Sequence, residues 1–168
     1  MSPALDIRRV RLEDAEALLA IYRPLVEETA VSFEMQPPDL GEFQDRIRQA
    51  LTQWEWLVAV ADGQVSGYAY GTAYRPRAAY RYSVEVSVYV HPNRQRSGIA
   101  EALYRELLGR LKALGYCNAY AGIALPNDAS IALHRKLGFA PVGLFRQIGW
   151  KFGCWHDIWM WHLRLGER

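Results

Sequence analysis

The sequence predicts a mixed α/β or α+β domain, because segments of strand character alternate with segments of helical character along the chain. Residues 84–90 (VEVSVYV) alternate with the period of two that a half-buried strand requires. Residues 98–114 place apolar side chains every three or four positions, as an amphipathic helix does. The length of 168 residues, with 51% apolar and 23% charged residues, fits one globular domain over residues 1–168.

Apolar spacing and turn residues define the elements expected in the first half of the chain. They are a strand over 5–10, a helix over 13–29, a loop over 30–36, a helix over 39–53, and strands over 56–61 and 64–74. Pro24 is expected to kink or split the first helix, because proline lacks the main-chain N–H used inside a helix. Asp39 and Glu42 have capping-box spacing, and Asp62-Gly63 is a hairpin signal.

The second half of the chain contains the two clearest elements. The expected order is a basic loop over 75–81, a strand over 84–90, a helix over 98–114, a strand over 117–124, a helix over 128–137 and a strand over 155–165. Gly115 and Gly138 end the two helices, because glycine readily adopts the left-handed conformation found there. Asn127 or Asp128 caps the second of these helices.

Composition and charge exclude several classes of protein. Lys and Arg total 20 and Asp and Glu total 18, without a long basic run, so we expect no nucleic-acid partner. No apolar run reaches the roughly 18 residues of a membrane span, and residues 1–10 lack a secretion signal, so we expect a cytoplasmic protein without membrane attachment. Cys117 and Cys154 fit no metal-binding or redox spacing, and no metal is expected.

The segment 88–100 joins a strand to a helix through a basic loop and a glycine. The first N–H groups of a helix lack internal partners and carry partial positive charge, so this junction can bind phosphate. Gly98 allows a ligand to approach the backbone closely, and Arg94 and Arg96 add positive charge. The pattern is neither a P-loop nor G-x-G-x-x-G, which argues against nucleotide hydrolysis. Taken alone, such a junction is also a common structural turn.

Two motifs in this region resemble those of the GNAT acetyltransferase superfamily. Gln95-x-x-Gly98-x-Ala100 is similar to the Q/R-x-x-G-x-G/A loop that binds acyl-CoA, and Ala100 stands where many relatives have a second glycine. Asn127, followed by a helix that ends in Leu137-Gly138-Phe139, resembles the second signature. Residues 31–34, 84–90 and 151–157 resemble the phosphinothricin and methionine sulfoximine N-acetyltransferase branch, so the resemblance covers nearly the whole chain.

This resemblance implies the GNAT fold, in which helices cover both faces of a mixed, mostly antiparallel, twisted sheet, and it implies a homodimer. It also implies acetyl-CoA as co-substrate, with its pyrophosphate at the start of the helix and its pantetheine along the preceding strand. The residues expected to bind it are Val88, Tyr89, Val90, Arg96, Ser97, Gly98, Ile99, Ala100, Glu101 and Asn127.

Glu85 is the candidate general base. An α-ammonium group must lose a proton before its nitrogen can attack a thioester. Glu85 lies in an apolar strand, on the face shared by Ser87 and Tyr89, where a carboxylate is costly unless paired. The corresponding glutamate of the family supports this role. The alternative is a structural ion pair with Arg77 or Arg81.

His134 is the candidate general acid for the leaving thiolate. Many GNAT enzymes place a tyrosine one turn before the Leu-Gly-Phe end of the helix, and here His134 has that position. Its ordinary pKa of about 6.5 suits proton transfer; the alternative is a neutral histidine on a helix face. A main-chain N–H around Tyr89 or Val90 would polarise the thioester carbonyl.

Arg75-Pro76-Arg77 is the candidate clamp for an acceptor carboxylate, because arginine binds carboxylates through two parallel hydrogen bonds. The alternative is a solvated basic loop. Trp150 and Lys151 are further candidates for the pocket wall. The residues expected to contact the acceptor are Phe33, Glu34, Arg75, Pro76, Arg77, Glu85, Val86 and Ser87.

We therefore expect an acetyl-CoA-dependent N-acetyltransferase that acts on the α-amine of small amino acid analogues such as phosphinothricin, methionine sulfoximine or methionine sulfone. A protein N-terminus or another amine is an alternative acceptor, and a non-catalytic CoA-binding module is an alternative of another class. Glu85 discriminates between the classes, because a non-catalytic module need not keep a carboxylate in this strand. An aminoglycoside would require an acidic pocket, which the basic loop at Arg75 disfavours.

Overall fold

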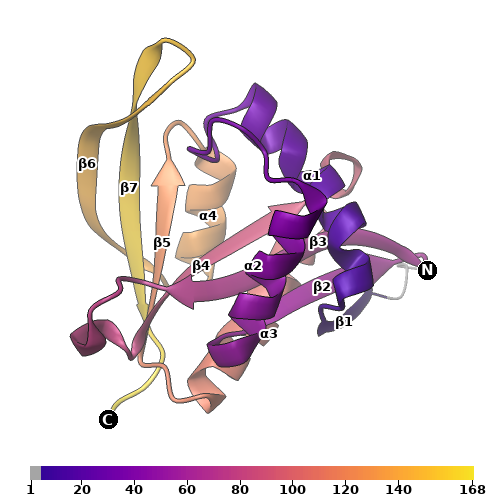
Figure 1. Cartoon of the computed structure of the whole chain (residues 1–168). Coiled ribbons are helices and arrows are strands. Elements are labelled where there is room, and N and C mark those ends of the chain that lie inside the picture. Colours follow the sequence, from indigo (N-terminus) through magenta and orange to yellow (C-terminus); the bar gives the residue numbers. More distant parts are fainter. Residues whose placement is uncertain (1–4) are drawn as a thin grey trace.

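A seven-stranded sheet organises the computed structural model, which describes residues 5–168 (Figure 1). The strands are β1 (Leu5–Arg9), β2 (Trp56–Ala61), β3 (Gln64–Ala73), β4 (Ser83–Val90), β5 (Asn118–Ala124), β6 (Ala140–Lys151) and β7 (Cys154–Arg164). Their order across the sheet is β1-β2-β3-β4-β5-β7-β6. Only the β4–β5 pair is parallel, and the other neighbours pair antiparallel. The expected mixed, mostly antiparallel sheet is confirmed.

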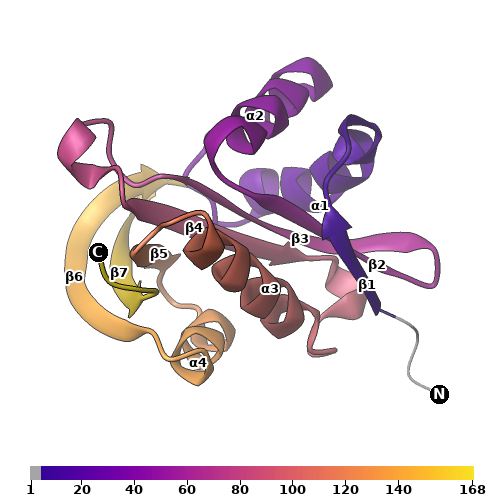
Figure 2. The same ribbon diagram turned by 90° about the horizontal axis from the view of Figure 1, so that it is seen from below.

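Four α-helices cover the two faces of this sheet. They are α1 (Ala15–Glu28), α2 (Leu40–Gln53), α3 (Ile99–Ala113) and α4 (Asp128–Lys136). Helices α1 and α2 lie on one face, and α3 and α4 lie on the other (Figure 2). The predicted caps are present, since Asp39 accepts a hydrogen bond from the N–H of Glu42 and Asn127 accepts one from that of Ser130.

Alternation along the strands divides the apolar side chains between two cores. Leu57 and Val84 face α3, where they pack with Leu107. Val58 and Tyr68 face α1 and α2 on the opposite side of the sheet. Burying each aliphatic side chain stabilises the fold by about 1.5–3 kcal/mol. The two cores therefore hold the sheet between the two helical layers.

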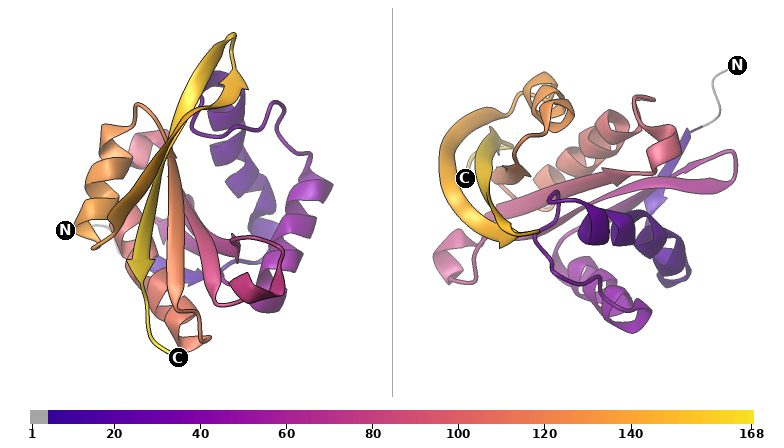
Figure 3. Two further views of the ribbon diagram at one scale, coloured as in Figure 1. Left: turned by 90° about the vertical axis from the view of Figure 1, so that its left-hand side faces the viewer. Right: turned by 90° about the horizontal axis from the view of Figure 1, so that it is seen from above.

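The structure differs from the sequence prediction at residues 140–151 and in one of the two alternatives expected at Pro24, the split. Helix α1 continues through Pro24 without splitting; the proline leaves one carbonyl without its helical donor, but Leu18, Tyr22 and Val26 keep the helix packed on the sheet. Residues 140–151 form β6, which was not expected, because most of its side chains are exposed on both faces and show no alternation. The β6–β7 hairpin projects past the ends of the neighbouring strands (Figure 3).

Candidate active site

Strands β4 and β5 pair over a short stretch and then diverge, which opens the sheet at its centre (Figure 1). Ser83–Glu85 align with Asn118–Tyr120, and no pairing between these strands continues beyond them. The opening forms a groove of about 630 Å³, bordered by β4, β5, the turn before α3, and the helices α3 and α4. Every residue expected to bind the cofactor lines this groove, and so do Val86, Ser87 and His134.

The start of α3 forms one end of the groove. Gly98 precedes the helix with φ 80° and ψ 0°, a left-handed conformation that favours glycine. Arg94 is paired with Asp62 at 2.9 Å. Arg96 makes no ion pair within residues 5–168 and remains available to a ligand anion. The helix start and Arg96 together give this end of the groove the positive charge that a pyrophosphate needs.

The open edge of β4 forms the wall of the groove. The N–H of His91 donates to the carbonyl of Ser66 on β3 at 2.9 Å. Because successive N–H groups of a strand point in opposite directions, the N–H of Tyr89 also points toward β3, whereas that of Val90 points toward the groove. The structure thus favours Val90 over Tyr89 as the main-chain donor to a thioester carbonyl.

Two of the expected cofactor residues have side chains that already bind other groups of the protein. The carboxylate of Glu101 is occupied by ion pairs with Lys136 at 2.5 Å and Arg105 at 2.8 Å. Asn127 uses its side-chain oxygen to cap α4 through the N–H of Ser130, at 3.1 Å. The groove is thus basic at the helix start and lined by apolar strand residues further on. This arrangement fits a ligand with a pyrophosphate and an extended thioester arm, as acetyl-CoA has.

Glu85 is a half-buried carboxylate without an ion-pair partner in the described part of the chain. Its neighbours across the strands are Thr72 on β3 and Tyr120 on β5. The alternative ion pair with Arg77 or Arg81 does not form. Burial raises the pKa of Glu85, and the charge of Arg75 opposes this rise. Such a carboxylate binds a proton more readily than an exposed one, as a general base must.

His134 lies on α4 and is 3% exposed. Its Nδ1 lies 2.7 Å from the carbonyl oxygen of Ser130, which can only accept, so the Nδ1 carries the proton. Its buried Nε2 has no hydrogen-bond partner within residues 5–168. Burial lowers the pKa of His134. In this neutral form the Nε2 accepts a proton, and a general acid would require a protonated Nε2, which burial opposes.

The expected acceptor residues lie in two loops and on β4, where Val86 and Ser87 line the groove but Glu85 does not. Val31, in the α1–α2 loop, lines the groove, but Phe33 and Glu34 do not. Arg75 lies over the ring of Tyr74, at 4.8 Å, and close enough to Glu85 to affect its pKa. Pro76 and Arg77 follow in the exposed loop before β4, and neither arginine forms an ion pair within residues 5–168.

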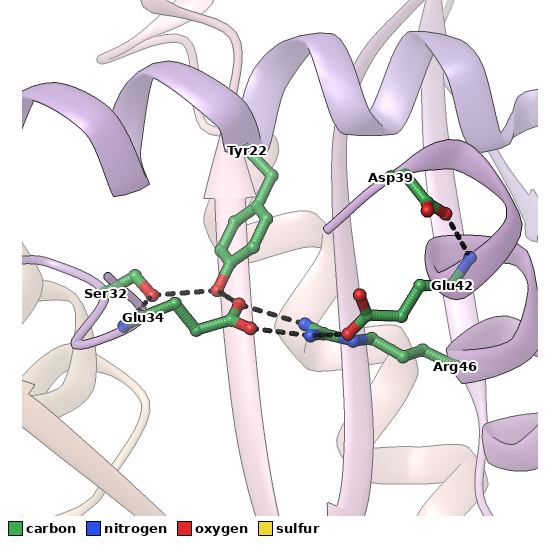
Figure 4. Close-up of polar contacts among 6 residues, drawn as sticks. All are labelled: Tyr22, Ser32, Glu34, Asp39, Glu42 and Arg46. Carbon is green, nitrogen blue, oxygen red and sulfur yellow. Dashed lines mark hydrogen bonds and ion pairs between the residues drawn. The ribbon is translucent and has the colours of Figure 1, made fainter. Parts of the chain in front are cut away.

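Glu34 anchors the α1–α2 loop (Figure 4). Two nitrogens of the Arg46 guanidinium donate to its carboxylate at 2.9 and 2.6 Å, and the hydroxyl of Tyr22 donates to the same group. Arg46 lowers the pKa of Glu34, so the carboxylate stays charged and paired. Tyr22 also contacts the hydroxyl of Ser32 at 2.8 Å. This network fixes the loop beside the groove, and sequence reasoning had not identified Tyr22 or Arg46.

Tyr104 is a further groove residue that sequence reasoning missed. It belongs to the apolar stripe of α3, so its spacing indicates only a core position.

A second cavity of about 310 Å³ lies between α2 and the strands β2 and β3, with largely aromatic walls. Residues 5–168 contain no group of three or more His, Cys, Asp or Glu side chains placed to hold a metal ion. No helix among the same residues could cross a membrane.

Comparison with known proteins relates this architecture to one family. A family model described as an acetyltransferase (GNAT) domain matches residues 7–160. The phosphinothricin N-acetyltransferase of Streptomyces viridochromogenes is 37% identical over 164 residues, which cover 96% of this chain and 90% of that protein. The L-methionine sulfoximine/L-methionine sulfone acetyltransferase of Pseudomonas aeruginosa is 38% identical, with coverage of 95% and 94%.

A solved structure extends the similarity to three dimensions. The phosphinothricin acetyltransferase of Sinorhizobium meliloti, crystallised in complex with AcCoA, superposes with a TM-score of 0.93 at 38% identity. The match covers 99% of this chain and 90% of that one. The groove, the family model and these relatives agree. The chain therefore belongs to the GNAT family and is an acetyl-CoA-dependent N-acetyltransferase.

Proposed function

We propose that this enzyme, acting as a single domain, acetylates the α-amino group of small amino acid analogues, with phosphinothricin, methionine sulfoximine and methionine sulfone as candidates. The observation that carries the proposal is the pair formed by Glu85 and Arg75. Glu85 is an unpaired, half-buried carboxylate, and Arg75 is a nearby arginine without a carboxylate partner in the described chain. An α-amino acid has the complementary groups, an amine beside a carboxylate.

The proposed roles follow from this pairing. Glu85 accepts a proton from the acceptor ammonium, directly or through a water, and so frees the nitrogen lone pair. Arg75 and Arg77 hold the carboxylate, and Pro76 limits the freedom of the loop. The N–H of Val90 donates to the thioester oxygen as negative charge develops there. Val86, Ser87, Phe33 and the loop fixed by Glu34 border the acceptor, and His134 borders the leaving sulfur.

The relatives support these acceptors, because two of them are named for phosphinothricin and for methionine sulfoximine and sulfone. A non-catalytic CoA-binding module fits less well, since it has no need of an unpaired carboxylate at Glu85. A protein N-terminus lacks an α-carboxylate and would leave the arginines without a partner. The basic loop likewise disfavours an aminoglycoside.

An acetyl-transfer screen that reads free CoA thiol tests the proposal. The panel contains methionine sulfone, methionine sulfoximine and phosphinothricin, their α-amides, simple alkyl amines and a short peptide. We expect the acids to react fastest, their amides more slowly and the alkyl amines least. Faster acetylation of the peptide or the alkyl amines than of every amino acid would overturn the proposed acceptor class.

We further propose that the enzyme is a cytoplasmic homodimer. The β6–β7 hairpin carries a group of exposed apolar side chains, a pattern that marks protein–protein interfaces. These are Val142, Leu144, Phe145, Ile148, Trp150, Phe152 and Trp155. The two free cysteines, Cys117 and Cys154, fit a reducing compartment. Sedimentation analysis of the parent and of a variant with Ile148→Lys and Trp155→Lys tests the dimer, which the variant should weaken.

A further inference from the structure

Tyr104 places an unpaired hydroxyl in the groove. The residue is 1% exposed overall and lines the groove from α3. Its hydroxyl makes no hydrogen bond within residues 5–168, and it is not one of the fully buried unpaired atoms of this part of the chain, so it is accessible from the groove. Its ring lies edge-on to His134, with 5.4 Å between the ring centroids. A ligand that fills the groove can therefore accept a hydrogen bond from this hydroxyl.

The position of Tyr104 corresponds to the middle of the groove. It follows Gly98 by six residues, which is roughly 9 Å along a helix that rises about 1.5 Å per residue. The carboxylate of Glu85 is also near enough to contribute to the pKa of Tyr104. Tyr104 thus lies between the end that suits a pyrophosphate and the proposed base. The thioester must occupy this interval, because the acceptor nitrogen has to reach its carbonyl carbon.

The neighbouring imidazole does not offer a proton to the same place. His134 uses its Nδ1 proton for the carbonyl of Ser130, and its Nε2 bears a lone pair. Tyr104 has one hydroxyl proton and no protein acceptor for it within the described residues. Of these two adjacent aromatic rings, only that of Tyr104 therefore has a proton free to donate.

We propose that Tyr104 donates the hydrogen bond that stabilises the sulfur as it leaves, which adds a catalytic residue to the reaction proposed above. The acceptor nitrogen forms a bond to the carbonyl carbon, and the carbon–sulfur bond breaks with its electron pair on sulfur. The ammonium loses its first proton to Glu85 before the attack, and the nitrogen loses its second proton to water once the new bond has formed. Tyr104 keeps its own proton, and the thiolate gains one from water on release.

The surroundings of Tyr104 suit a donor that is not itself consumed. Burial raises the pKa of its hydroxyl, and the negative charge of Glu85 adds to this effect. The phenol therefore stays protonated across neutral pH. Hydrogen bonds to charged groups exceed neutral ones in strength, so the contact becomes stronger as negative charge develops on sulfur. This difference between ground state and transition state is what accelerates a reaction.

Tyr104→Phe tests the role, because it removes the hydroxyl and keeps the ring against His134. We expect the single-turnover rate of acetyl transfer to fall about 10- to 100-fold, the usual effect of one hydrogen bond to a charged group. The affinity for acetyl-CoA should change less than about threefold, as for an interaction made mainly in the transition state. Tyr116→Phe is the matched control, because its hydroxyl bonds the carbonyl of Gln53 outside the groove.

The selenium analogue of acetyl-CoA separates a role in leaving-group departure from a structural one. Selenolate is a weaker base than thiolate and needs less stabilisation, so the Tyr104→Phe defect should shrink with this donor. Three outcomes would overturn the assignment. The Tyr104→Phe defect could be equally large with the selenium analogue, or the Tyr104→Phe rate could lie within threefold of the parent rate. The third outcome is a defect in His134→Gln, and not in Tyr104→Phe, that shrinks with the selenium analogue. The assay uses whichever panel amine the parent acetylates. Failure of the amino acid analogues as acceptors would thus count against the proposed substrate and not against Tyr104.

Discussion

The ammonium group of Lys151 donates a hydrogen bond to the main-chain carbonyl of Ser32, 119 residues earlier in the chain, at 2.7 Å. A second hydrogen bond of 2.6 Å reaches the carbonyl of Val26, near the end of α1. Lys151 is 2% exposed, and both contacts are buried. The end of β6 is thereby tied to the loop that borders the groove. Lys151 is engaged with buried main-chain carbonyls, which argues against its expected place in the pocket wall.

Lys151→Met should destabilise the fold, because it keeps most of the side-chain volume but leaves two buried carbonyls without their donor. Leaving one such group unsatisfied costs about 1–3 kcal/mol, so we expect the free energy of unfolding to fall by at least that amount. Urea unfolding measures the loss. Lys112→Met, at an exposed lysine of α3, is the control. Equal unfolding midpoints for the two variants would show that the tie contributes nothing.

Glu85→Gln should leave acetyl-CoA binding intact and lower the acetylation rate at pH 7 by about 10²–10⁴-fold, the usual effect of losing a general base. The defect should diminish at high pH, where the amine loses its proton unaided. In the parent, burial raises the pKa of Glu85. The rate should therefore fall on acidification at a higher pH than an ordinary glutamate would cause. A pH 7 rate within a few-fold of the parent would refute the role.

The same substitution should stabilise the protein. A carboxyl group whose pKa is raised by folding favours the folded state only while it is protonated, and this contribution is lost as the pH rises through the folded pKa. Above its folded pKa the parent carries a half-buried, unpaired charge that glutamine lacks. We expect Glu85→Gln to gain about 0.5–2 kcal/mol at pH 7 and little near pH 3. Thermal unfolding at the two pH values tests the sign.

Gly98→Asp should weaken acetyl-CoA binding by adding negative charge at the start of α3. The φ of 80° at Gly98 also penalises any side chain, so charge and backbone effects must be separated. Gly98→Asn is the matched control, because asparagine has nearly the same shape, carries no charge and tolerates the left-handed region. We expect the aspartate variant to bind about tenfold more weakly than the asparagine variant in calorimetry. Equal affinities would contradict a phosphate site here.

The sequence predicts those helices and strands that are set by contacts between residues close together in the chain. The helix from Gly98 and the strand over 84–90 were predictable, because their periodicity is set by neighbouring residues. Strand β6 was not, because it is exposed on both faces and interrupted by Gly143 and Gly149. The split expected at Pro24 does not occur for a similar reason, since packing against distant strands maintains the helix.

The candidate site divides in the same way. All the expected cofactor residues except Asn127 lie in the segment 88–101, so one motif located them, and each of them lines the groove. Tyr104 was hidden in the apolar stripe of α3, where an active tyrosine and a core tyrosine have the same spacing. The engagement of Glu34 by Arg46 and of Lys151 by Ser32 depends on loops that meet only after folding. No local signal reports such contacts.

Arg75→Ala and Arg77→Ala should each lower kcat/KM for acidic acceptors by about ten- to a hundredfold, since hydrogen bonds to charged groups contribute roughly 1.5–3 kcal/mol. The loss should be smaller for the corresponding amides, which offer no negative charge. Steady-state kinetics on methionine sulfone and its amide measures this difference. Arg81→Ala, in the same loop, is the comparison variant. Unchanged kinetics in both arginine variants would place the carboxylate clamp elsewhere.

Gly149 on β6 lies directly against the ring of Phe33, in the loop after α1. A Cβ atom added at Gly149 would come within 2.2 Å of the Phe33 ring, whereas one added at Gly143 on the same strand would meet nothing within 4 Å. Gly149→Ala must therefore displace Phe33, at a cost of about 1–3 kcal/mol typical of overpacking. Gly143→Ala is the matched control and should have little effect on the free energy of unfolding.

Because Phe33 is expected to contact the acceptor, Gly149→Ala should also raise the KM for methionine sulfone and leave the affinity for acetyl-CoA within about twofold. A double-mutant cycle isolates the contact. In the Phe33→Ala background the ring is absent, so the added methyl group meets no obstacle and Gly149→Ala should cost little stability. Equal costs in the two backgrounds would mean that Gly149 acts through the backbone of the hairpin and not through the space it leaves for Phe33.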